Sequence, residues 1–389
     1  MHRLLSLVIL LCGALRADTT LVLPFFNHSK TPSLDWVGES IAESMHDSLA
    51  TEGLLVLDRA DRLEAYRRLS LRPGAELTHA SVLKIGDSLD ATNVIYGSYE
   101  LLDGATAQSK GSVRIEARIL NLKKTHQGPA ISETGALEDL ATLEVRLGWL
   151  ALESLRGKSA PPEADFLRAR PPVRLDAIES YVRGLLATTA EQRHRFFTQA
   201  ARLDEHYSQP CYELGKIYWT RKDYKVAMGW LQRVARTDPH YLESQFFLGL
   251  CKFYNGDFQG AEEAFQLVAA VMPLNEVFNN LGAAQDRRNN SAGAAVNFQK
   301  ALEGDSADPD YHFNLGYTLW RTGKYAEAVE SLRAAVARDP ADTEATTLLG
   351  RALKQQGPRP GDSKIDGRER VKTNYDEAAY RQLQAELAK

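Results

Sequence analysis

The chain has 389 residues, 44% hydrophobic and 25% charged, a composition typical of globular proteins that excludes a chain disordered throughout. Its net charge is −4, and its 47 basic and 51 acidic residues form no long run of one sign. General nucleic-acid binding is therefore not expected, because that affinity depends on clustered lysine and arginine.

The amino-terminal stretch 1–17 is typical of a targeting segment. A short basic start precedes the apolar run Leu4 to Leu15, which is too short to span a bilayer, and Ala17 stands before polar residues. This order predicts a cleaved signal peptide and a periplasmic or exported protein with no integral membrane span after cleavage. Two alternatives stay open. One is an uncleaved anchor or buried first strand, and the other is a lipoprotein anchored at Cys12, although a bulky leucine precedes it.

Strand and helix patterns alternate through residues 18–156 and predict a mixed α/β domain. Within 112–120, apolar and polar residues alternate as in an antiparallel strand with one exposed face. Strands are expected at 20–26, 54–58, 93–101, 112–120 and 131–137, and helices at 34–49, 61–69, 79–91 and 138–155.

This half also resembles a known family. A strand ending in Pro-Phe, a glycine-containing helix, a strand ending near arginine, a second glycine-containing helix and a strand with Gly-Ser follow one another. These landmarks are Pro24-Phe25, Gly38, Arg59, Gly86 and Gly97-Ser98. In this order the chain resembles the TolB amino-terminal-like domain, whose relatives include envelope proteins of the FlgO and CsgG type. The resemblance covers Thr20 to Leu122 and implies a protein–protein module of the cell envelope without known catalysis.

The stretch 157–174 contains two Pro-Pro pairs. Proline is excluded from helix interiors and pushes the preceding residue toward extended conformations. We therefore expect a semi-rigid linker between the α/β domain and the carboxy-terminal half of the chain.

Beyond the linker, a Leu-Gly pair recurs at spacings of 34, 33, 34 and 34 residues. An alanine follows each of the first four glycines after 12 residues, and a proline follows three of them after 24. A fixed period of this length is the signature of helix pairs stacked into a solenoid, where glycine and alanine permit close helix contact. The pairs are Leu214-Gly215, Leu248-Gly249, Leu281-Gly282, Leu315-Gly316 and Leu349-Gly350.

Residues 175–357 therefore resemble tetratricopeptide repeats (TPR), with a degenerate first unit around Gly184, four Leu-Gly units and the start of a fifth. The resemblance implies that an all-α TPR superhelical solenoid follows the α/β domain. The final stretch 358–389 begins with a Pro/Gly-rich, charged loop. It ends in a predicted helix, which we expect to cap the solenoid as the displaced second helix of the fifth unit.

Motifs that carry enzyme chemistry are weak. Gly-Asp-Ser-Leu at 86–89 matches lipases and esterases with a serine nucleophile, but Ser88 lies in a helical pattern and the family's Asp-x-x-His motif is absent. The histidines lack metal-site spacing and no phosphate-binding loop occurs, so we expect no catalytic residue, metal or cofactor. Cys211 and Cys251 occupy apolar repeat positions and are expected to be buried thiols.

The first helix of each repeat unit supplies the predicted binding surface. In this architecture, positions three before, one after and four after the Leu-Gly glycine line the concave face, and aromatic anchors are frequent there. Lys216 and Arg321 flank this stripe and would favour an acidic end on the ligand. The alternatives are aromatic residues that only pack, or a site on the convex face or the α/β domain. The predicted groove consists of Tyr212, Lys216, Trp219, Phe246, Leu250, Phe253, Phe313, Tyr317, Trp320 and Arg321, with Asn279, Ala283 and Asp286 at the equivalent positions of the third unit.

These patterns together predict an exported, non-enzymatic adaptor that binds a protein or peptide partner in the bacterial cell envelope. Two other classes of function stay open. One is a structural assembly factor that acts by homo-oligomerisation, and the other is a hydrolase that uses Ser88.

Overall fold

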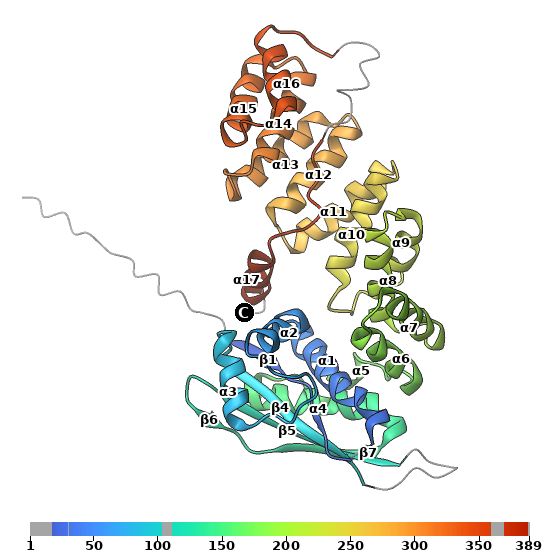
Figure 1. Cartoon of the computed structure of the whole chain (residues 1–389). Helices are drawn as coiled ribbons and strands as arrows, with labels where there is room; N and C mark the ends of the chain where they lie inside the picture. Colours follow the sequence, from blue (N-terminus) through green and yellow to red (C-terminus); the bar gives the residue numbers. More distant parts are fainter. Residues whose placement is uncertain (1–17, 30, 103–110, 359–368, 388–389) are drawn as a thin grey trace, which may run out of the picture.

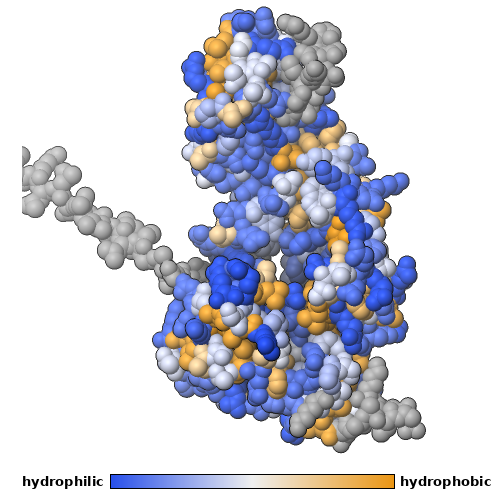
Figure 2. Space-filling model, viewed as in Figure 1, coloured by the Kyte–Doolittle hydropathy of each residue, from blue (hydrophilic) through white to orange (hydrophobic). Residues whose placement is uncertain are grey.

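The structure, a computed structural model, describes residues 18–29, 31–102, 111–358 and 369–387. An α/β domain lies at one end and a curved stack of helices extends from it (Figure 1), which confirms the predicted fold class. The face in Figure 2 is mostly hydrophilic, with hydrophobic residues in small separate patches. The predicted signal peptide lies outside the described residues. Among those described, no helix combines the length and apolar character that crossing a membrane requires.

The α/β domain is built on one mixed sheet. Its strand order is β3-β1-β4-β5-β6, with β2 also paired to β4 and β7 to β5. The strands β1, β2 and β3 pair with their neighbours in parallel, whereas β5 pairs antiparallel with β4, β6 and β7. The strands are β1 (Thr19–Val22), β2 (Phe26–Asn27), β3 (Leu55–Val56), β4 (Asn93–Leu101), β5 (Ser112–Asn121), β6 (His126–Gln127) and β7 (Ile131–Ala136).

The predicted strand at 20–26 is interrupted. Pro24 has no N–H to donate and separates β1 from β2. The flanking amides bond in different directions, because Leu23 N–H donates to the Ile95 carbonyl and Phe25 N–H donates to the Gly38 carbonyl of the next helix. The chain therefore leaves the sheet for one step and returns to pair with the end of β4.

Helices cover both faces of the sheet. α1 (Trp36–Thr51) and α4 (Leu140–Arg156) pack on one face, and α2 (Arg59–Arg68) and α3 (His79–Ser88) pack on the other. Successive strand residues alternate between the two cores, as the pleat requires. In β1, Leu21 belongs to the core beneath α2 and α3, and Val22 to the core beneath α1 and α4.

The solenoid consists of antiparallel helix pairs stacked in chain order. Its helices are α6 (Leu175–Leu186), α7 (Ala190–Leu203), α8 (Ser208–Thr220), α9 (Tyr224–Leu231), α10 (Tyr241–Tyr254), α11 (Phe258–Val271), α12 (Asn275–Arg287), α13 (Ser291–Gly304), α14 (Pro309–Arg321), α15 (Tyr325–Arg338) and α16 (Thr343–Leu353). The spaced alanines Ala227, Ala261, Ala294 and Ala328 are all 0% exposed, in line with the predicted close packing of the helices.

The Leu-Gly glycines lie where the two helices of a unit touch. A Cβ added to Gly316 would stand 2.7 Å from the Leu332 side chain, and one on Gly215 would stand 2.5 Å from Leu231. Side chains at these positions would separate the paired helices. Gly350 differs, because no atom lies within 4 Å of its added Cβ. Among the described residues, the fifth unit has only its first helix, α16, so no paired helix packs against this glycine.

The stretch 157–174 is not a free linker. It contains η3 (Gly157–Ser159) and α5 (Glu163–Arg168), and Phe166 on α5 is 2% exposed. The Arg170 side chain stacks on that ring and reaches Glu52 of the α/β domain at 2.8 Å. The same hydrophobic core continues from α1 and α4 into α6. The Pro-Pro pairs therefore exclude long helices here, but buried apolar contacts dock the segment onto the α/β domain.

The predicted capping helix forms, as α17 (Glu377–Leu387), but it does not cap the solenoid. It lies beside the α/β domain, far from α16 (Figure 1). Arg381 on this helix pairs with Asp58 at 2.8 Å and Asp61 at 2.9 Å, at the start of α2. These ion pairs, together with Tyr380 against the continuous core, attract the helix to the α/β domain instead of to α16.

Candidate functional site

An extended segment of the chain itself lies along the concave face of the solenoid. Residues 369–376, hereafter the tail segment, descend from the α16 end past α12 and lead into α17 (Figure 1). Their partners come from the first helices of successive units, α10, α12, α14 and α16. The structure thus shows which side chains of the concave face can hold an extended polypeptide.

Three buried asparagines hold the backbone of the tail segment. The Arg370 N–H donates to Asn314 Oδ1 at 2.8 Å, and Asn314 Nδ2 donates back to the Arg370 carbonyl at 2.9 Å. Asn280 makes the same pair of bonds to Lys372, at 2.7 and 2.8 Å. Asn279 adds a bond to the Arg370 carbonyl at 2.8 Å. All three asparagines are 0% exposed, and we call them the asparagine clamp.

The basic side chains of the tail segment meet an acidic cluster. The Arg370 guanidinium lies 2.7 Å from Asp342 and 3.1 Å from Asp310, and also reaches Glu344 at 3.5 Å. Lys372 Nζ lies 2.7 Å from both Asp308 and Asp310. We call these four carboxylates, Asp308, Asp310, Asp342 and Glu344, the acidic cluster.

One carboxylate of the cluster, Asp342, has its pKa shifted by the Arg370 cation. Burial alone would raise the pKa of Asp342, but the hydrogen bond and charge of Arg370 hold that pKa below its ordinary value. Arg370 also covers the Phe313 ring, with its guanidinium carbon 3.6 Å from the ring centroid. The site therefore recognises a planar cation through both charge and an aromatic face.

An aromatic contact marks the other end of the tail segment. The rings of Tyr375 and Phe246 meet edge to face, with centroids 5.3 Å apart. The Asp376 N–H donates to Glu276 at 3.0 Å just before α17 begins. Between these ends, Val371 packs against the core of the solenoid.

The predicted groove residues fall into two groups. Phe313 and Phe246 contact the tail segment, and Phe253 lines the same hollow as Val371. The others contact residues of their own or the neighbouring repeat. Tyr212 stacks on His240, Lys216 lies over Tyr212, and Trp219 packs against Phe247 and Tyr254. Leu250 is 0% exposed, Tyr317 lies between Phe313 and Trp320, and Trp320 donates to the Gln356 carbonyl. Their contribution to partner binding stays a prediction.

Arg321 is paired within the repeats, and its predicted role in ligand binding stays a prediction. Its guanidinium lies 2.6 Å from Asp286, which is 0% exposed and also accepts from Thr318. A buried carboxylate holds the arginine within the repeats because separating them would leave an unpaired buried charge. The side chains that face Arg370 and Lys372 are acidic, whereas Glu369 at the start of the tail segment lies 3.6 Å from Arg287, so the groove presents charges of both signs to the tail segment.

Asn279 of the clamp occupies a predicted groove position, whereas Asn280 and Asn314 have a signal in the sequence that is distinct from the aromatic stripe. Asparagine stands directly before the Leu-Gly pair in two successive units, as Asn280 and Asn314. The same position holds Glu213, Phe247 and Leu348 in the other units. A polar amide repeated at a buried position of the concave face is unusual, because buried polar groups need partners.

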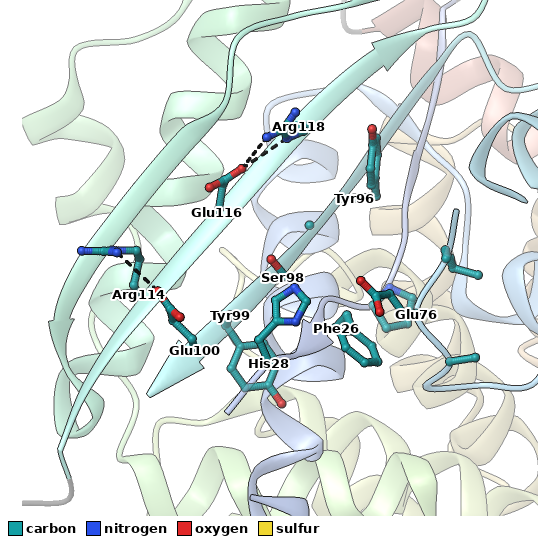
Figure 3. A pocket seen from close by; sticks show the side chains of 14 residues that line it. Phe26, His28, Glu76, Tyr96, Ser98, Tyr99, Glu100, Arg114, Glu116 and Arg118 are labelled. Carbon is teal, nitrogen blue, oxygen red and sulfur yellow. Dashed lines mark hydrogen bonds and ion pairs between the residues drawn. The ribbon is translucent and has the colours of Figure 1, made fainter. Parts of the chain in front are cut away.

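The α/β domain offers a second surface, shown in Figure 3. A depression between β2, β4, β5 and the loop before α3 is lined by Phe26, His28, Tyr96 and Ser98, among others. Its two arginines are already paired with carboxylates: Arg114 lies 3.3 Å from Glu100, and Arg118 lies 2.9 Å from Glu116. This depression is therefore a weaker candidate for ligand binding than the groove of the solenoid.

The structure gives ordinary roles to the residues of the other motifs. Ser88 ends α3, and its hydroxyl donates to the Ile85 carbonyl at 2.7 Å, as serines near helix ends commonly do. Cys211 and Cys251 are free thiols at 0% exposure, and burial raises their pKa values to about 11 and about 12. Within the part of the chain that the structure describes, no group of three or more His, Cys, Asp or Glu side chains is arranged so that it could hold a metal ion.

Comparison with known proteins identifies the repeats. A tetratricopeptide-repeat family model matches residues 212–273, 279–343 and 313–357. Solved structures with a similar fold include MamA from Desulfovibrio magneticus RS-1, 21% identical over 42% of this chain and 92% of that one, with a TM-score of 0.38. Another is YrrB, a TPR protein described as having an unusual peptide-binding site, 19% identical over 41% and 82% of the two chains, with a TM-score of 0.36. No curated protein matches the chain significantly. The TolB-like resemblance of the α/β domain stays a prediction.

Proposed function

We propose that this chain, a tetratricopeptide solenoid joined to an α/β domain, is a non-enzymatic protein-interaction scaffold whose groove binds an extended polypeptide. The asparagine clamp is the observation that carries the proposal. Side-chain amides that bond both the N–H and the C=O of one residue recognise a backbone, as a neighbouring strand does. The tail segment occupies this site in the isolated chain.

A partner must compete with the tail segment. A tethered segment acts at an effective concentration in about the millimolar range, so a free peptide needs either higher affinity or a weakened tail. The contacts that hold the tail segment are mainly hydrogen bonds and ion pairs, which another segment of the same chemistry can replace.

The experiment uses a labelled peptide with the sequence of residues 369–376. It is titrated into the full chain carrying Arg370→Ala with Lys372→Ala, which weakens the tail in its own groove. We expect saturable binding, and weaker apparent binding to the wild-type chain. The matched control adds Asn280→Ala and Asn314→Ala and should lose the peptide while keeping its helical circular dichroism. Absence of binding to the weakened-tail chain would overturn the proposal.

We further place this scaffold in the bacterial cell envelope as an exported protein. The basic, apolar and small-residue order of 1–17 and the envelope-module resemblance of 20–122 support this placement. Amino-terminal sequencing of the protein from the envelope fraction should begin near Asp18. A sequence that begins at Met1 would rule out cleavage of a signal peptide. A sequence that begins at a lipidated Cys12 would show that the exported protein is anchored to the membrane by a lipid.

A further inference from the structure

We infer that the partner of the groove is another protein's extended segment with the pattern Arg-x-Lys, which displaces the tail segment from its own groove. This inference rests on the proposed function and adds the chemistry of the partner. The clamp alone would accept any extended backbone, so selectivity must come from the side chains.

The spacing of the basic residues follows from the geometry. In an extended chain, alternate side chains point to the same side. Arg370 and Lys372 have their backbones held by the clamp and their side chains directed to the acidic cluster, while Val371 between them packs on the solenoid. One residue between the two cations therefore matches the spacing of the clamp. Adjacent cations, or cations separated by two residues, would place one of them on the opposite side.

Two carboxylates of the acidic cluster are held in place by the helices that they cap. Asp308 and Asp342 are the N-cap residues of α14 and α16, and each uses one oxygen to accept helix N–H groups. The other oxygen meets the tail segment: Asp308 Oδ2 lies 2.7 Å from Lys372, and Asp342 Oδ2 lies 2.7 Å from Arg370. A carboxylate fixed by its helix loses little entropy on binding a cation.

The acidic N-caps belong to one end of the groove. The N-cap residues of the other Leu-Gly units are Tyr207, His240 and Leu274, none of which is acidic. The asparagine clamp lies on α12 and α14, next to the two acidic N-caps. Backbone recognition and cation recognition thus coincide at one end of the solenoid, which defines a binding site and not a general surface charge.

Displacement would also be felt at the α/β domain. The tail segment continues directly into α17, whose Arg381 pairs with Asp58 and Asp61. A partner that removes residues 369–376 from the groove pulls on this contact. We therefore expect binding to increase hydrogen exchange in α17 of the wild-type chain.

The test is a competition series against the labelled peptide bound to the weakened-tail chain. Competitors are the unlabelled 369–376 peptide, versions with leucine at the arginine or at the lysine, and one with an alanine inserted between the valine and the lysine. We expect each change to weaken competition at least about tenfold, since each removes a charge-assisted contact. Equal competition by all versions would overturn Arg-x-Lys selectivity and leave the proposed function intact. If no peptide binds at all, the proposed function itself fails.

Variants of the groove test the same recognition by changing the protein and not the peptide. Asp308→Asn and Asp342→Asn keep a good helix cap but remove the charge, so the fold should survive while the discrimination between lysine or arginine and leucine falls. Glu330→Gln, an exposed carboxylate on α15, is the control and should leave the discrimination unchanged. Unaltered discrimination in both aspartate variants would overturn the inference.

A light-scattering dilution series tests whether the groove instead binds the tail segment of a second copy of this chain. Dimers of the wild-type chain that disappear with Arg370→Ala and Lys372→Ala would assign the groove to the tail segment of a second copy. That outcome would overturn the assignment to a different protein. A monomer at all concentrations supports it.

Discussion

Asn314 holds the backbone of Arg370 on both sides of its Cα, accepting from the Arg370 N–H at 2.8 Å and donating to the Arg370 carbonyl at 2.9 Å. The two residues are far apart in sequence, and Asn314 itself lies in the interior of α14. A buried asparagine in a helix is unfavourable unless its amide is satisfied, and here the tail segment satisfies it. The groove and the tail segment therefore complete each other's hydrogen bonding.

The first prediction concerns this contact. Asn314→Ala removes both bonds and leaves the Arg370 amide without its partner, so we expect a loss of about 1–3 kcal/mol in the stability of the docked tail. Hydrogen exchange at the amides of Arg370 and Lys372 should accelerate accordingly. Asn255→Ala, at an exposed turn of the second Leu-Gly unit, serves as the control and should change neither amide. Slow exchange in the Asn314 variant would show that the clamp is not what holds the segment.

The second prediction compares two repeat glycines. Gly316→Ala places a methyl group 2.7 Å from Leu332, and overpacking of this kind costs about 1–3 kcal/mol. Gly350→Ala meets nothing within 4 Å and lies inside α16, where alanine is favoured over glycine by about 1 kcal/mol. Urea unfolding should therefore move in opposite directions for the two variants. Equal effects would contradict the role of the glycine as a helix–helix contact.

How much of this structure the sequence predicts depends on the range of the contacts. The repeat period located Gly316 and its equivalents because paired helices repeat the same local contact in every unit. Alternation along 112–120 located β5, since one face of that strand is buried and the other exposed. Pro24 was visible, but the return of the chain to β4 after it was not, because pairing of so short a strand depends on neighbours distant in sequence.

The tail segment lay beyond sequence reasoning for a similar reason. Residues 369–376 have neither helical nor strand periodicity, and their conformation is set by Asn280 and Asn314 on other elements. The final helix was predicted, yet its position was not, because a helical pattern does not reveal which surface receives it. Arg381 pairs with Asp58 and Asp61, a contact between opposite ends of the chain.

The third prediction concerns the turns within the repeats. The turn within each of the first four Leu-Gly units has one residue with positive φ, which is glycine at 256 and 323 and asparagine at 289 but lysine at 222, with φ 61°. A lysine side chain is strained in this conformation, so Lys222→Gly should raise the free energy of unfolding by about 0.5–1 kcal/mol. Lys225→Gly, within α9, is the matched control and should lower it by about 1 kcal/mol. Thermal melting of both variants shows whether a change in stability comes from the backbone conformation at residue 222 or from the loss of a lysine side chain.

The last prediction concerns pH and the buried carboxyl of Glu144. This residue on α4 is 2% exposed, and burial raises its pKa to about 8 against a smaller opposing effect of the hydrogen bond from Ser40. Since the folded pKa exceeds the ordinary 4.5, the folded chain retains a proton that the unfolded chain has released between these values. The contribution of protonated Glu144 to the free energy of unfolding is therefore complete below pH 4.5 and is lost as the pH rises toward about 8.

Glu144→Gln keeps the shape of the side chain and removes its charge, so the variant should not lose stability through this group as the pH rises. We expect the variant to approach the wild type in stability at about pH 5 and to exceed it increasingly up to about pH 9, as measured by urea unfolding at each pH. Glu153→Gln, an exposed position on the same helix, is the control and should show a difference from the wild type that does not vary with pH. A constant difference for Glu144→Gln as well would mean that this carboxyl reaches water in the folded chain, because only burial raises its pKa here.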